Sequence, residues 1–416
     1  MSLIWRPFTQ MQKAPPTPTV LKAKNTNLFL KNNKKVIDAI SSWWVITHGH
    51  CKTEIVKAVQ KTAKDLDQVL FANFSHEKAE KLIKELSKFL PKNLNKFFFS
   101  DNGSTAIEVA LKIAVQSFSQ KGQAQKKEFL SFKNSYHGDT AGAMSVSARG
   151  VFTKAYKRFL FPIHSCSQGQ LSTDPDKMFY EDFERKIEKH HKKLCAVIIE
   201  PLIQGAGGMI IWPPAVLERI CRIAKAEGLY LIFDEIMTGF GRTGTLFAMD
   251  QIKTKPDILC LSKGLTGGFL PLALTISTDN IYKDFLSQKK EKALLHGHSF
   301  TGNPLSCSAA LANLKLIQKN KFKLKNKWAW IEETNKQRLA HFKKHPKVKD
   351  VRAKGVIAVI QKESAYESFF AEQASQKALR QGVFLRPLGG TLYILPPYCI
   401  TKKELHKVWD VIESLF

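Results

Sequence analysis

The segment DILCLSKGLTGG (residues 257–268) ends a short apolar run with a lysine, Lys263, which serine and glycine surround. Short apolar runs bounded by turn residues are typical of strands that are buried on both faces of a sheet. A charged amine is out of place at the end of such a strand unless it has a function. Lys263 is therefore the first candidate functional residue of the chain.

Two further apolar runs, with a helix between them, predict the layout around this strand. LCAVIIEP (194–201) and LYLIFDE (229–235) are typical of buried strands, and AVLERICRIAKAEG (215–228) of an amphipathic helix with Gly228 as its C-cap. This order forms a βαβ unit, whose strands run parallel. With the helical apolar spacing of residues 104–118, it predicts an α/β fold, a mostly parallel central sheet flanked by helices.

The C-terminal part of the chain predicts a second, smaller unit. Gly389-Gly390 is typical of a hairpin turn between strands, and Thr401 with Glu404 of a capping box that opens a terminal helix. The predicted strands are KGVIAVI (354–360), GVFLRPL (382–388) and TLYILPP (391–397). We expect an N-terminal arm and strands of the small domain in residues 1–50, a large domain in 51–305, and a C-terminal small α+β domain in 306–416.

Length, composition and cysteine content exclude several classes of protein. With 416 residues, of which 44% are hydrophobic, the chain can bury a large core. Its 7 cysteines are scattered singly, which is typical of reduced thiols in a cytosol and gives no zinc or redox motif. The start lacks a secretory signal pattern, and no apolar run approaches the roughly 20 residues that cross a bilayer. We expect a cytoplasmic protein that does not bind a membrane.

The net charge of +28 is the unusual bulk property of the sequence. It raises the alternative of binding to nucleic acid or to an anionic membrane. The lysines are spread along the whole chain, whereas a binding surface for phosphates gathers them on one arm or helix. The spread favours a solvated lysine surface and no specific nucleic-acid partner.

An acidic residue stands at a second strand end. In LIFDEIMTGFGRTG (231–244), Asp234 ends an apolar strand, where ligands gather in open α/β sheets. Alone, an aspartate in this position is more often an N-cap or half of a salt bridge. Together, Asp234 and Lys263 would bring an acid and an amine to one crevice. A lysine can form a Schiff base with an aldehyde and an aspartate can pair with a protonated pyridine nitrogen, so the pair predicts a site for pyridoxal 5'-phosphate.

The same stretch contains GFGRTG (239–244), which matches the dinucleotide-binding pattern G-x-G-x-x-G. The glycines do not directly follow the strand, no long helix comes after them, and no acidic residue stands about 20 positions further on. This context disfavours a dinucleotide site.

A phosphate site is predicted where FFFSDNGSTAIEVALK (97–112) passes from a strand into a helix. Gly103 and Ser104 open this helix, so backbone N–H groups and the helix dipole point at an anion. An ordinary serine N-cap is the alternative. Tyr136 and His137, in NSYHGDT (134–140), could supply an aromatic face for a flat ring, although an aromatic residue in a loop more often serves packing.

These motifs are similar to those of a known family. FDEIMTGFGRTG, SKGLTGG, HGHSFTGNPLSCSAAL and EPLIQGAGGM together resemble the class III aminotransferases of fold type I, and the likeness covers essentially the whole chain. Within the class, IWRPFTQM, ISSWWVITHGH, SYHGDTAGAMSV and RPLGGTLYILPPY resemble the enzymes that aminate 8-amino-7-oxononanoate in biotin synthesis. The resemblance implies a fold type I transferase with pyridoxal 5'-phosphate as its cofactor.

The resemblance also implies roles for residues around the cofactor. Lys263 is expected to bind the cofactor covalently, and Asp234 to pair with its pyridinium nitrogen. Gly103 and Ser104 are expected to hold the phosphate, with Tyr136 near the ring and the substrate.

A further segment of the resemblance concerns the assembly of the protein. Gly297, His298 and Ser299 match a segment that in the family reaches the partner subunit's cofactor phosphate, so we expect a homodimer with shared active sites. The family most often has threonine where Ser299 stands, and the hydroxyl is kept. His296 and His298 have no other potential metal ligands near them in the sequence, so no metal is expected.

On the substrate side, the resemblance implies an aromatic wall and two arginines. Trp43 and Trp44 match the family's wall beside a keto acid that carries a long apolar chain and a terminal carboxylate. Arg386 matches the arginine expected to bind that carboxylate, an interaction suited to a bidentate guanidinium. Arg242 is the second substrate-side arginine of the family pattern.

The implied reaction passes the amino group of S-adenosylmethionine to the ketone of 8-amino-7-oxononanoate, giving 7,8-diaminononanoate. Some members of the family use lysine as the donor instead. Many of those that use S-adenosylmethionine have tyrosine in the opening arm where this chain has Phe8. Because the missing hydroxyl removes a hydrogen bond near the substrate, lysine stays open as an alternative donor.

Three other functions are alternatives to this aminotransferase reaction. Another class III ω-aminotransferase, acting for example on ornithine or acetylornithine, would share the cofactor residues but should lack the SSWW wall (41–44). A binding protein that uses its positive charge would not need Lys263. A mutase or racemase of the same fold would show no net amino transfer to a second substrate.

Overall fold

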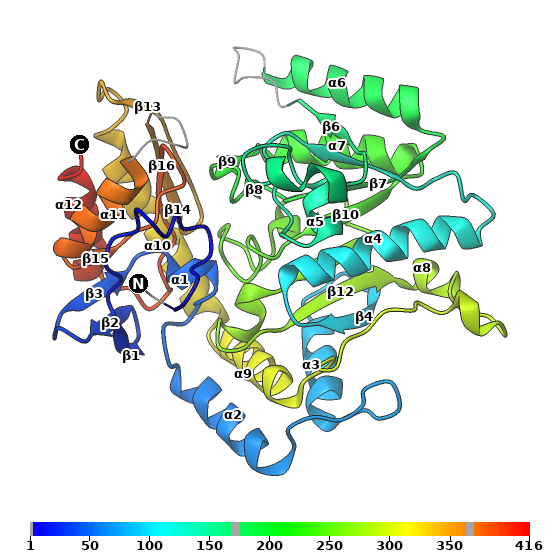
Figure 1. Cartoon of the computed structure of the whole chain (residues 1–416), viewed down its shortest axis with the longest axis horizontal. Coiled ribbons are helices and arrows are strands. Elements are labelled where there is room, and N and C mark those ends of the chain that lie inside the picture. Colours follow the sequence, from blue (N-terminus) through cyan, green and yellow to red (C-terminus); the bar gives the residue numbers. More distant parts are fainter. Residues whose placement is uncertain (1–2, 168–174, 363–369) are drawn as a thin grey trace.

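A seven-stranded sheet forms the centre of the larger part of the molecule (Figure 1). The computed structural model describes residues 3–167, 175–362 and 370–416. The strands lie in the order β4-β12-β11-β10-β7-β5-β6. Strand β12 is antiparallel to both neighbours, and the other neighbouring pairs are parallel, which confirms the predicted mostly parallel sheet. The strands span Leu94–Ser100 (β4), Glu128–Phe132 (β5), His164–Cys166 (β6), Leu194–Ile199 (β7), Tyr230–Asp234 (β10), Ile258–Leu261 (β11) and Ala273–Thr278 (β12).

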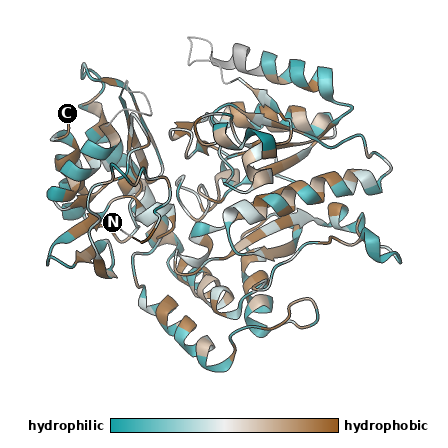
Figure 2. Cartoon of the chain, in the orientation of Figure 1, coloured by the Kyte–Doolittle hydropathy of each residue, from teal (hydrophilic) through white to brown (hydrophobic). Residues whose placement is uncertain are grey.

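Apolar clusters cover both faces of this sheet. Ala196 and Ile198 of β7 pack in one cluster with helix α4 (Gly103–Gln120), while Val197 and Ile199 belong to the cluster on the opposite face. Successive side chains of a strand point to opposite faces, so a continuous apolar run indicates a strand buried on both sides. Figure 2 shows these strands mostly in brown and the outer surfaces of the helices mostly in teal.

The larger region also contains α-helices and short 3-10 turns. The α-helices are Thr53–Asp65 (α2), Glu77–Ser87 (α3), Gly103–Gln120 (α4), Ala141–Val146 (α5), Pro175–His190 (α6), Pro214–Ala226 (α7), Asp279–Lys283 (α8) and Pro304–Lys319 (α9). Short 3-10 turns span Lys154–Phe159 (η1), Ala248–Gln251 (η2), Lys263–Thr266 (η3) and Lys290–Lys292 (η4). Helix α4 confirms the helical spacing noted in residues 104–118.

The predicted βαβ unit is confirmed by β7, α7 and β10. Strands β7 and β10 are parallel neighbours, and α7 joins them. Gly228 follows the helix with φ of 66°, and its N–H donates to the carbonyl of Lys225. A left-handed residue just after a helix is the usual C-terminal stop, and glycine adopts it without strain. Strand β11 is the parallel neighbour on the other side of β10, so the ends of β7, β10 and β11 lie side by side at one edge of the sheet.

The N-terminal and C-terminal segments together build a smaller region, where both ends of the chain lie (Figure 1). One sheet has the order β1-β2-β3-β15 and another the order β13-β14-β16. Their strands are Val20–Lys24 (β1), Asn27–Leu30 (β2), Lys35–Asp38 (β3), Val348–Lys354 (β13), Ile357–Lys362 (β14), Val383–Phe384 (β15) and Thr391–Ile394 (β16). The helices are Ser41–Trp44 (α1), Lys321–Ala340 (α10), Phe370–Arg380 (α11) and Lys402–Glu413 (α12), and Thr401 with Glu404 forms the predicted capping box of α12.

The Gly389-Gly390 turn is confirmed, but it does not join a long hairpin. The N–H of Leu388 donates to the carbonyl of Thr391 and the reverse bond is also made, both at 2.9 Å. Beyond this single bridge the chain diverges, because β15 pairs with β3 and β16 pairs with β14. The turn therefore passes the chain from one small sheet to the other.

Helix α9 lies where the two regions meet. It packs on α2 and α3 of the larger region, and α10 follows it directly into the smaller one. The division of the chain at residues 50 and 305 stays a prediction. A two-stranded sheet of Ile203–Gln204 (β8) and Ile210–Ile211 (β9) completes the fold. Within the described ranges, no helix combines the length and the apolar content needed to cross a membrane.

Burial of His48 predicts a loss of stability in mild acid. Its ring lies 6.2 Å from that of Tyr398, and burial, followed by the charge of Lys52, lowers the pKa of His48 to about 4. The unfolded chain has the ordinary histidine pKa of about 6.5, so it binds the proton first as the pH falls. The free energy of unfolding should therefore drop by roughly 2–3 kcal/mol between pH 7.5 and pH 4.5 through this residue.

Chemical denaturation at the two pH values measures this effect. His48→Gln should remove most of the pH-dependent difference that His48 contributes. His341→Gln, at an exposed histidine, should leave the difference as it is in the wild type. An unchanged difference in His48→Gln would show that other groups cause the acid sensitivity.

Candidate active site

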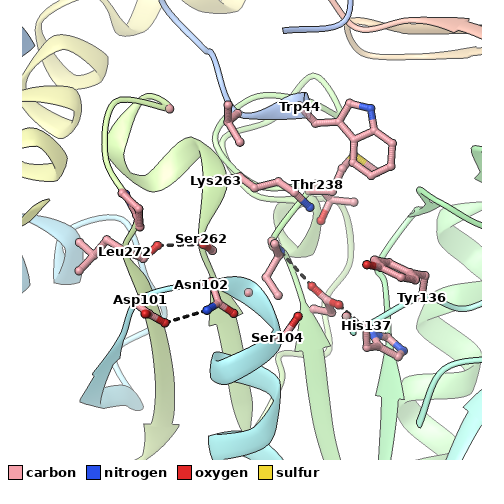
Figure 3. Close-up of a pocket in the computed structure, with 18 of the residues that line it drawn as sticks. Trp44, Asp101, Asn102, Ser104, Tyr136, His137, Thr238, Ser262, Lys263 and Leu272 are labelled. Carbon is pink, nitrogen blue, oxygen red and sulfur yellow. Dashed lines mark hydrogen bonds and ion pairs between the residues drawn. The ribbon is translucent and has the colours of Figure 1, made fainter. Parts of the chain in front are cut away.

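A cavity of about 510 Å³ opens at the edge of the sheet where the parallel strands end. Asp234 ends β10, Glu200 directly follows β7, and Lys263 comes two residues after β11. The first turn of α4, with Gly103 and Ser104, lines the same space (Figure 3). Ligands of open α/β sheets bind at this edge. The structure thus brings together six of the predicted site residues, namely Lys263, Asp234, Gly103, Ser104, Tyr136 and Trp44.

Lys263 presents its amine to the cavity without a competing partner. Its backbone has φ of 45°, and Nζ lies 5.1 Å from the centre of the Trp44 ring. Nζ forms no hydrogen bond or ion pair with the part of the chain that the structure describes. Burial lowers the pKa of Lys263, and the charges of Asp234 and Glu200 oppose that shift. A lower pKa leaves more of the amine neutral and nucleophilic.

Asp234 is held in one orientation by two donors. Its Oδ2 lies 2.7 Å from Nδ1 of His137, and its Oδ1 accepts the N–H of Ile236 at 3.1 Å. His137 is itself fixed, because its backbone N–H donates to Oγ of Ser147 at 2.9 Å. Carboxylate and imidazole are both buried. A carboxylate oriented in this way at a cavity wall suits a cationic heterocycle nitrogen.

Glu200 is a second strand-end acid, which the sequence reasoning missed. Its Oε2 accepts the N–H of Tyr136 at 3.0 Å and its Oε1 accepts the N–H of Gly205 at 2.9 Å. Burial raises the pKa of Glu200 to about 7. The interaction with His137 lowers this pKa, and the charge of Asp234 raises it. The signal was present, because this acid directly follows the apolar run LCAVII (194–199) in the same way that Asp234 follows LYLIF (229–233).

Tyr136 lies on a loop that packs against the start of α4. Its hydroxyl donates to Oδ2 of Asp139 at 2.8 Å, and burial together with this bond raises the pKa of Tyr136. The N–H of Asp139 donates to Oγ of Ser104 at 3.2 Å. A Cβ on Gly138, whose φ is 132°, would come within 2.1 Å of that Oγ, so only glycine allows this approach. Because its pKa is raised, Tyr136 stays a protonated phenol on the cavity wall.

The start of α4 has the features of an anion site. Asn102, and not a serine, is the N-cap: its side chain accepts the N–H of Thr105 at 3.0 Å in a capping box. The alternative of a serine N-cap is therefore wrong. The N-terminal N–H groups of this 18-residue helix lie beside Gly103 and Ser104 at the cavity. An amine, an oriented acid and an anion site in one cavity fit the three functional parts of pyridoxal 5'-phosphate.

Trp43 and Trp44 face different neighbours. Trp44 lines the cavity, and its Nε1 donates to the hydroxyl of Tyr393 at 2.9 Å. Trp43 is 37% exposed, and its ring lies 5.0 Å from Cζ of Arg386 and 5.5 Å from the ring of Phe8. Trp43, Arg386 and Phe8 thus form an aromatic and cationic cluster outside the residues that line the cavity.

Arg242 is almost completely buried behind this wall. Its Nη2 donates to the carbonyls of Trp44 at 3.1 Å and Ile46 at 2.9 Å. Its Cζ lies 5.2 Å from the centre of the Tyr398 ring. Arg242 is not among the residues that line the cavity. The structure shows it bound to the backbone of the wall, and direct contact with substrate stays a prediction.

Gly297, His298 and Ser299 also lie outside the cavity lining of their own chain. The N–H of His298 donates to Oγ1 of Thr301 at 3.1 Å, and the carbonyl of Ser299 accepts from Nε2 of Gln68 at 3.1 Å. The predicted contact of this segment with a second subunit's cofactor stays a prediction.

Comparison with known proteins places this geometry in a family. The chain matches the family model for aminotransferase class-III over residues 9–416. It is 41% identical to the adenosylmethionine-8-amino-7-oxononanoate aminotransferase of Synechococcus elongatus, over 99% of this chain and 98% of the relative. The crystal structure of the enzyme of that name from Methanocaldococcus jannaschii is similar with a TM-score of 0.92 at 34% identity, covering 99% of this chain and 97% of the other.

An amine transaminase from an uncultivated Pseudomonas species, solved in its PLP-bound form, is similar with a TM-score of 0.93 at 26% identity, covering 100% of this chain and 98% of the other. The strand-end lysine and acid thus stand in a chain whose whole length aligns with transaminases. This chain belongs to the class-III aminotransferases.

Proposed function

We propose that this chain transfers the amino group of S-adenosylmethionine to the ketone of 8-amino-7-oxononanoate and so forms 7,8-diaminononanoate, a step of biotin synthesis. The names of the full-length relatives support this pair of substrates. The observation that carries the proposal is the cavity with the amine of Lys263 and the carboxylate of Asp234 beside the Trp43 and Arg386 cluster.

The cofactor of the reaction is pyridoxal 5'-phosphate. When bound, it supplies an aldehyde for the amino group and a ring that takes up electrons from the substrate carbon. With the cofactor bound, Lys263 would hold the aldehyde carbon and Asp234 would pair with the ring nitrogen. Gly103 and Ser104 would bind the phosphate through the start of α4. Tyr136, which lines the same cavity, would lie near the ring and the substrate.

Lys263 also moves the proton in both half-reactions. With the cofactor bound, the donor's amino group would free Nζ from the aldehyde carbon, and Nζ would then take the proton from the carbon that carries that amino group. In the second half-reaction it would return a proton to the carbon of the acceptor's ketone. Because burial lowers the pKa of Lys263, a larger neutral fraction can accept that proton near neutral pH. The approach of Trp44 to Nζ restricts water at the reacting atom.

The aromatic and cationic cluster binds the long acid. The Trp43 ring covers methylene groups, each contributing roughly 0.8 kcal/mol when buried. The guanidinium of Arg386 makes no hydrogen bond or ion pair with the described residues, so it is available for a terminal carboxylate. Phe8 packs on this wall and takes part in binding, and Arg242 acts on the substrate side by holding the wall from behind.

The active unit is a homodimer in which Gly297, His298 and Ser299 of each subunit complete the site of the other. Their position outside their own chain's cavity supports this arrangement. Large apolar side chains next to the segment are exposed, with Leu295 at 66% and Phe300 at 64%, as expected of a surface that a second copy covers. The seven cysteines are all free, which supports a reducing cytoplasm as the location.

A donor exchange experiment tests the function. The protein loaded with pyridoxal 5'-phosphate is mixed with S-adenosylmethionine or with lysine, and 8-amino-7-oxononanoate is then added. We expect S-adenosylmethionine to bleach the visible absorbance of the cofactor and the keto acid to restore it, with 7,8-diaminononanoate detected by mass spectrometry. Bleaching by lysine alone would assign lysine as the donor and connect Phe8 with that change, and no bleaching by either would overturn the proposed substrates.

A further inference from the structure

The segment SSWW (41–44), which contains the wall residues Trp43 and Trp44, forms a turn with an unusual backbone. Ser41, Ser42 and Trp44 have φ of 55°, 59° and 66°. Residues other than glycine rarely adopt the left-handed region, and three of them within four positions persist only where the surroundings hold them. The turn is therefore shaped by its contacts and not by its own preference.

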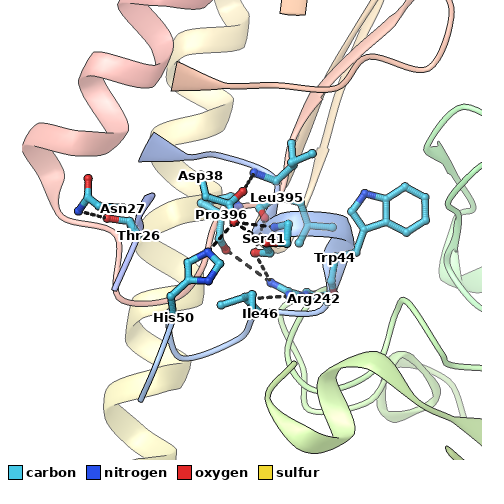
Figure 4. A network of polar contacts seen from close by, with 12 residues as sticks. Thr26, Asn27, Asp38, Ser41, Trp44, Ile46, His50, Arg242, Leu395 and Pro396 are labelled. Carbon is cyan, nitrogen blue, oxygen red and sulfur yellow. Dashed lines mark hydrogen bonds and ion pairs between the residues drawn. The ribbon is translucent and has the colours of Figure 1, made fainter. Parts of the chain in front are cut away.

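A buried carboxylate supplies the main contacts that hold the turn. Asp38, at the end of β3, accepts the N–H of Ile40 at 3.2 Å through Oδ1 and the N–H of Ser42 at 2.6 Å through Oδ2 (Figure 4). Nε2 of His50 lies 2.8 Å from the same Oδ2. His50 is anchored in turn, because its backbone pairs with Asn25 through bonds of 3.1 Å and 2.7 Å.

The far side of the turn is fixed by the rest of the fold. Oγ of Ser41 donates to the carbonyl of Leu395 at 2.7 Å. Arg242 holds the carbonyl of Trp44 (Figure 4). Asp38 and His50 are both buried, with exposed fractions of 0% and 8%. The turn is thus clamped between the buried contact of Asp38 with His50 on one side and a buried arginine on the other.

The two tryptophans of the turn connect the two ends of the substrate site. Trp44 lies 5.1 Å from Nζ of Lys263, and the adjacent Trp43 lies 5.0 Å from Cζ of Arg386. A single peptide bond joins the residue beside the reacting amine to the residue beside the guanidinium. A rigid turn therefore fixes how far the amine stands from the group that receives the terminal carboxylate.

We infer that Asp38 and His50 are positioning residues that select the length of the keto-acid chain by clamping this turn. The inference rests on the proposed function, because it takes Arg386 as the site of the substrate's terminal carboxylate. Neither residue lines the cavity, so both act through Trp43 and Trp44.

The inference is tested by measuring kcat/KM of the loaded enzyme for 8-amino-7-oxononanoate and for the homologues one methylene shorter and one longer. We expect the wild type to prefer the natural length by at least roughly tenfold, the usual effect of one methylene in a fitted site. His50→Phe keeps a ring but removes the donor to Asp38, and it should reduce the preference to less than about threefold, mainly by raising KM for the natural acid. His50→Gln, which can still donate through Nε2, should restore the preference.

Two further variants separate positioning from folding. Ser42→Gly removes the side chain at a left-handed position, so it should fold well while loosening the turn and weakening the length preference. His76→Phe is the matched control, since His76 is 8% exposed and also bound through Nε2, to the carbonyl of Gly302. It should change the melting temperature without altering the ratio of rates for the three acids.

The outcomes are distinct. Preservation of the wild-type length preference in His50→Phe and Ser42→Gly overturns the inference, and so does an equal loss for all three acids in His50→Phe. If the wild type does not aminate 8-amino-7-oxononanoate at all, the proposed function is wrong. That result is distinct from a loss of length preference in the variants.

Discussion

Replacing Lys263 with alanine is expected to reduce amino transfer by about 10⁴-fold or more, because proton transfer by one placed group contributes up to that factor and covalent binding of the cofactor is lost as well. No other lysine among the described residues lines the cavity, so no second amine can take over. The fold should persist, since Nζ makes no hydrogen bond with residues 3–167, 175–362 or 370–416 that the change would break.

The measurement combines the rate with a covalent trap. Borohydride reduction of the loaded wild type should fix the cofactor to the peptide that carries Lys263, and the same treatment of Lys263→Ala should leave that peptide unlabelled. Lys255→Ala is a matched control, because Nζ of Lys255 donates to the carbonyls of Met249 and Ile252, away from the cavity. It should retain the rate within about twofold. A rate above 1% of wild type in Lys263→Ala would contradict the assigned role.

The sequence was sufficient to predict the strand-end residues of the site. Lys263 and Asp234 each follow a continuous apolar run, and the rule that parallel strands end at one edge of a sheet is enough to bring them together. Glu200 obeys the same rule and could have been predicted by applying it to every strand. Periodicity also predicted the α7 crossover and its stop at Gly228, because both depend on residues close together in the chain.

Contacts between distant segments could not be predicted in this way. Arg242 stands in a glycine-rich stretch that suggests a ligand loop, yet its partners are carbonyls almost 200 residues away, at Trp44 and Ile46. The clamp of Asp38 and His50 leaves no local signal, because the serines it forces into the left-handed region are not residues that favour it. Such features become visible only when the fold has brought the segments together.

The second large effect is expected for Asp234→Asn, which should lower the rate of amino transfer by roughly 10²–10⁴-fold. The amide keeps the size of the side chain and can still accept the N–H of Ile236, but it removes the negative charge that is proposed to pair with the ring nitrogen. Loss of one partner from a buried charge pair costs about 3–5 kcal/mol, which corresponds to that range of rates. Steady-state kinetics should show the loss mainly in kcat, because the electron-accepting power of the ring is needed in the transition state.

A cofactor analogue sharpens this test. With an N-methylated pyridine ring, the positive charge no longer depends on a carboxylate, so the analogue should recover part of the activity of Asp234→Asn and none of that of Lys263→Ala. Glu235→Gln is the matched control: Glu235 is the next residue, but its oxygens accept the N–H groups of Ala248 and Met249, outside the cavity. It should reduce stability and leave kcat of the folded enzyme close to wild type. An equal loss of kcat in both variants, without recovery by the analogue, would mean that Asp234 supports the fold and does not hold the ring nitrogen.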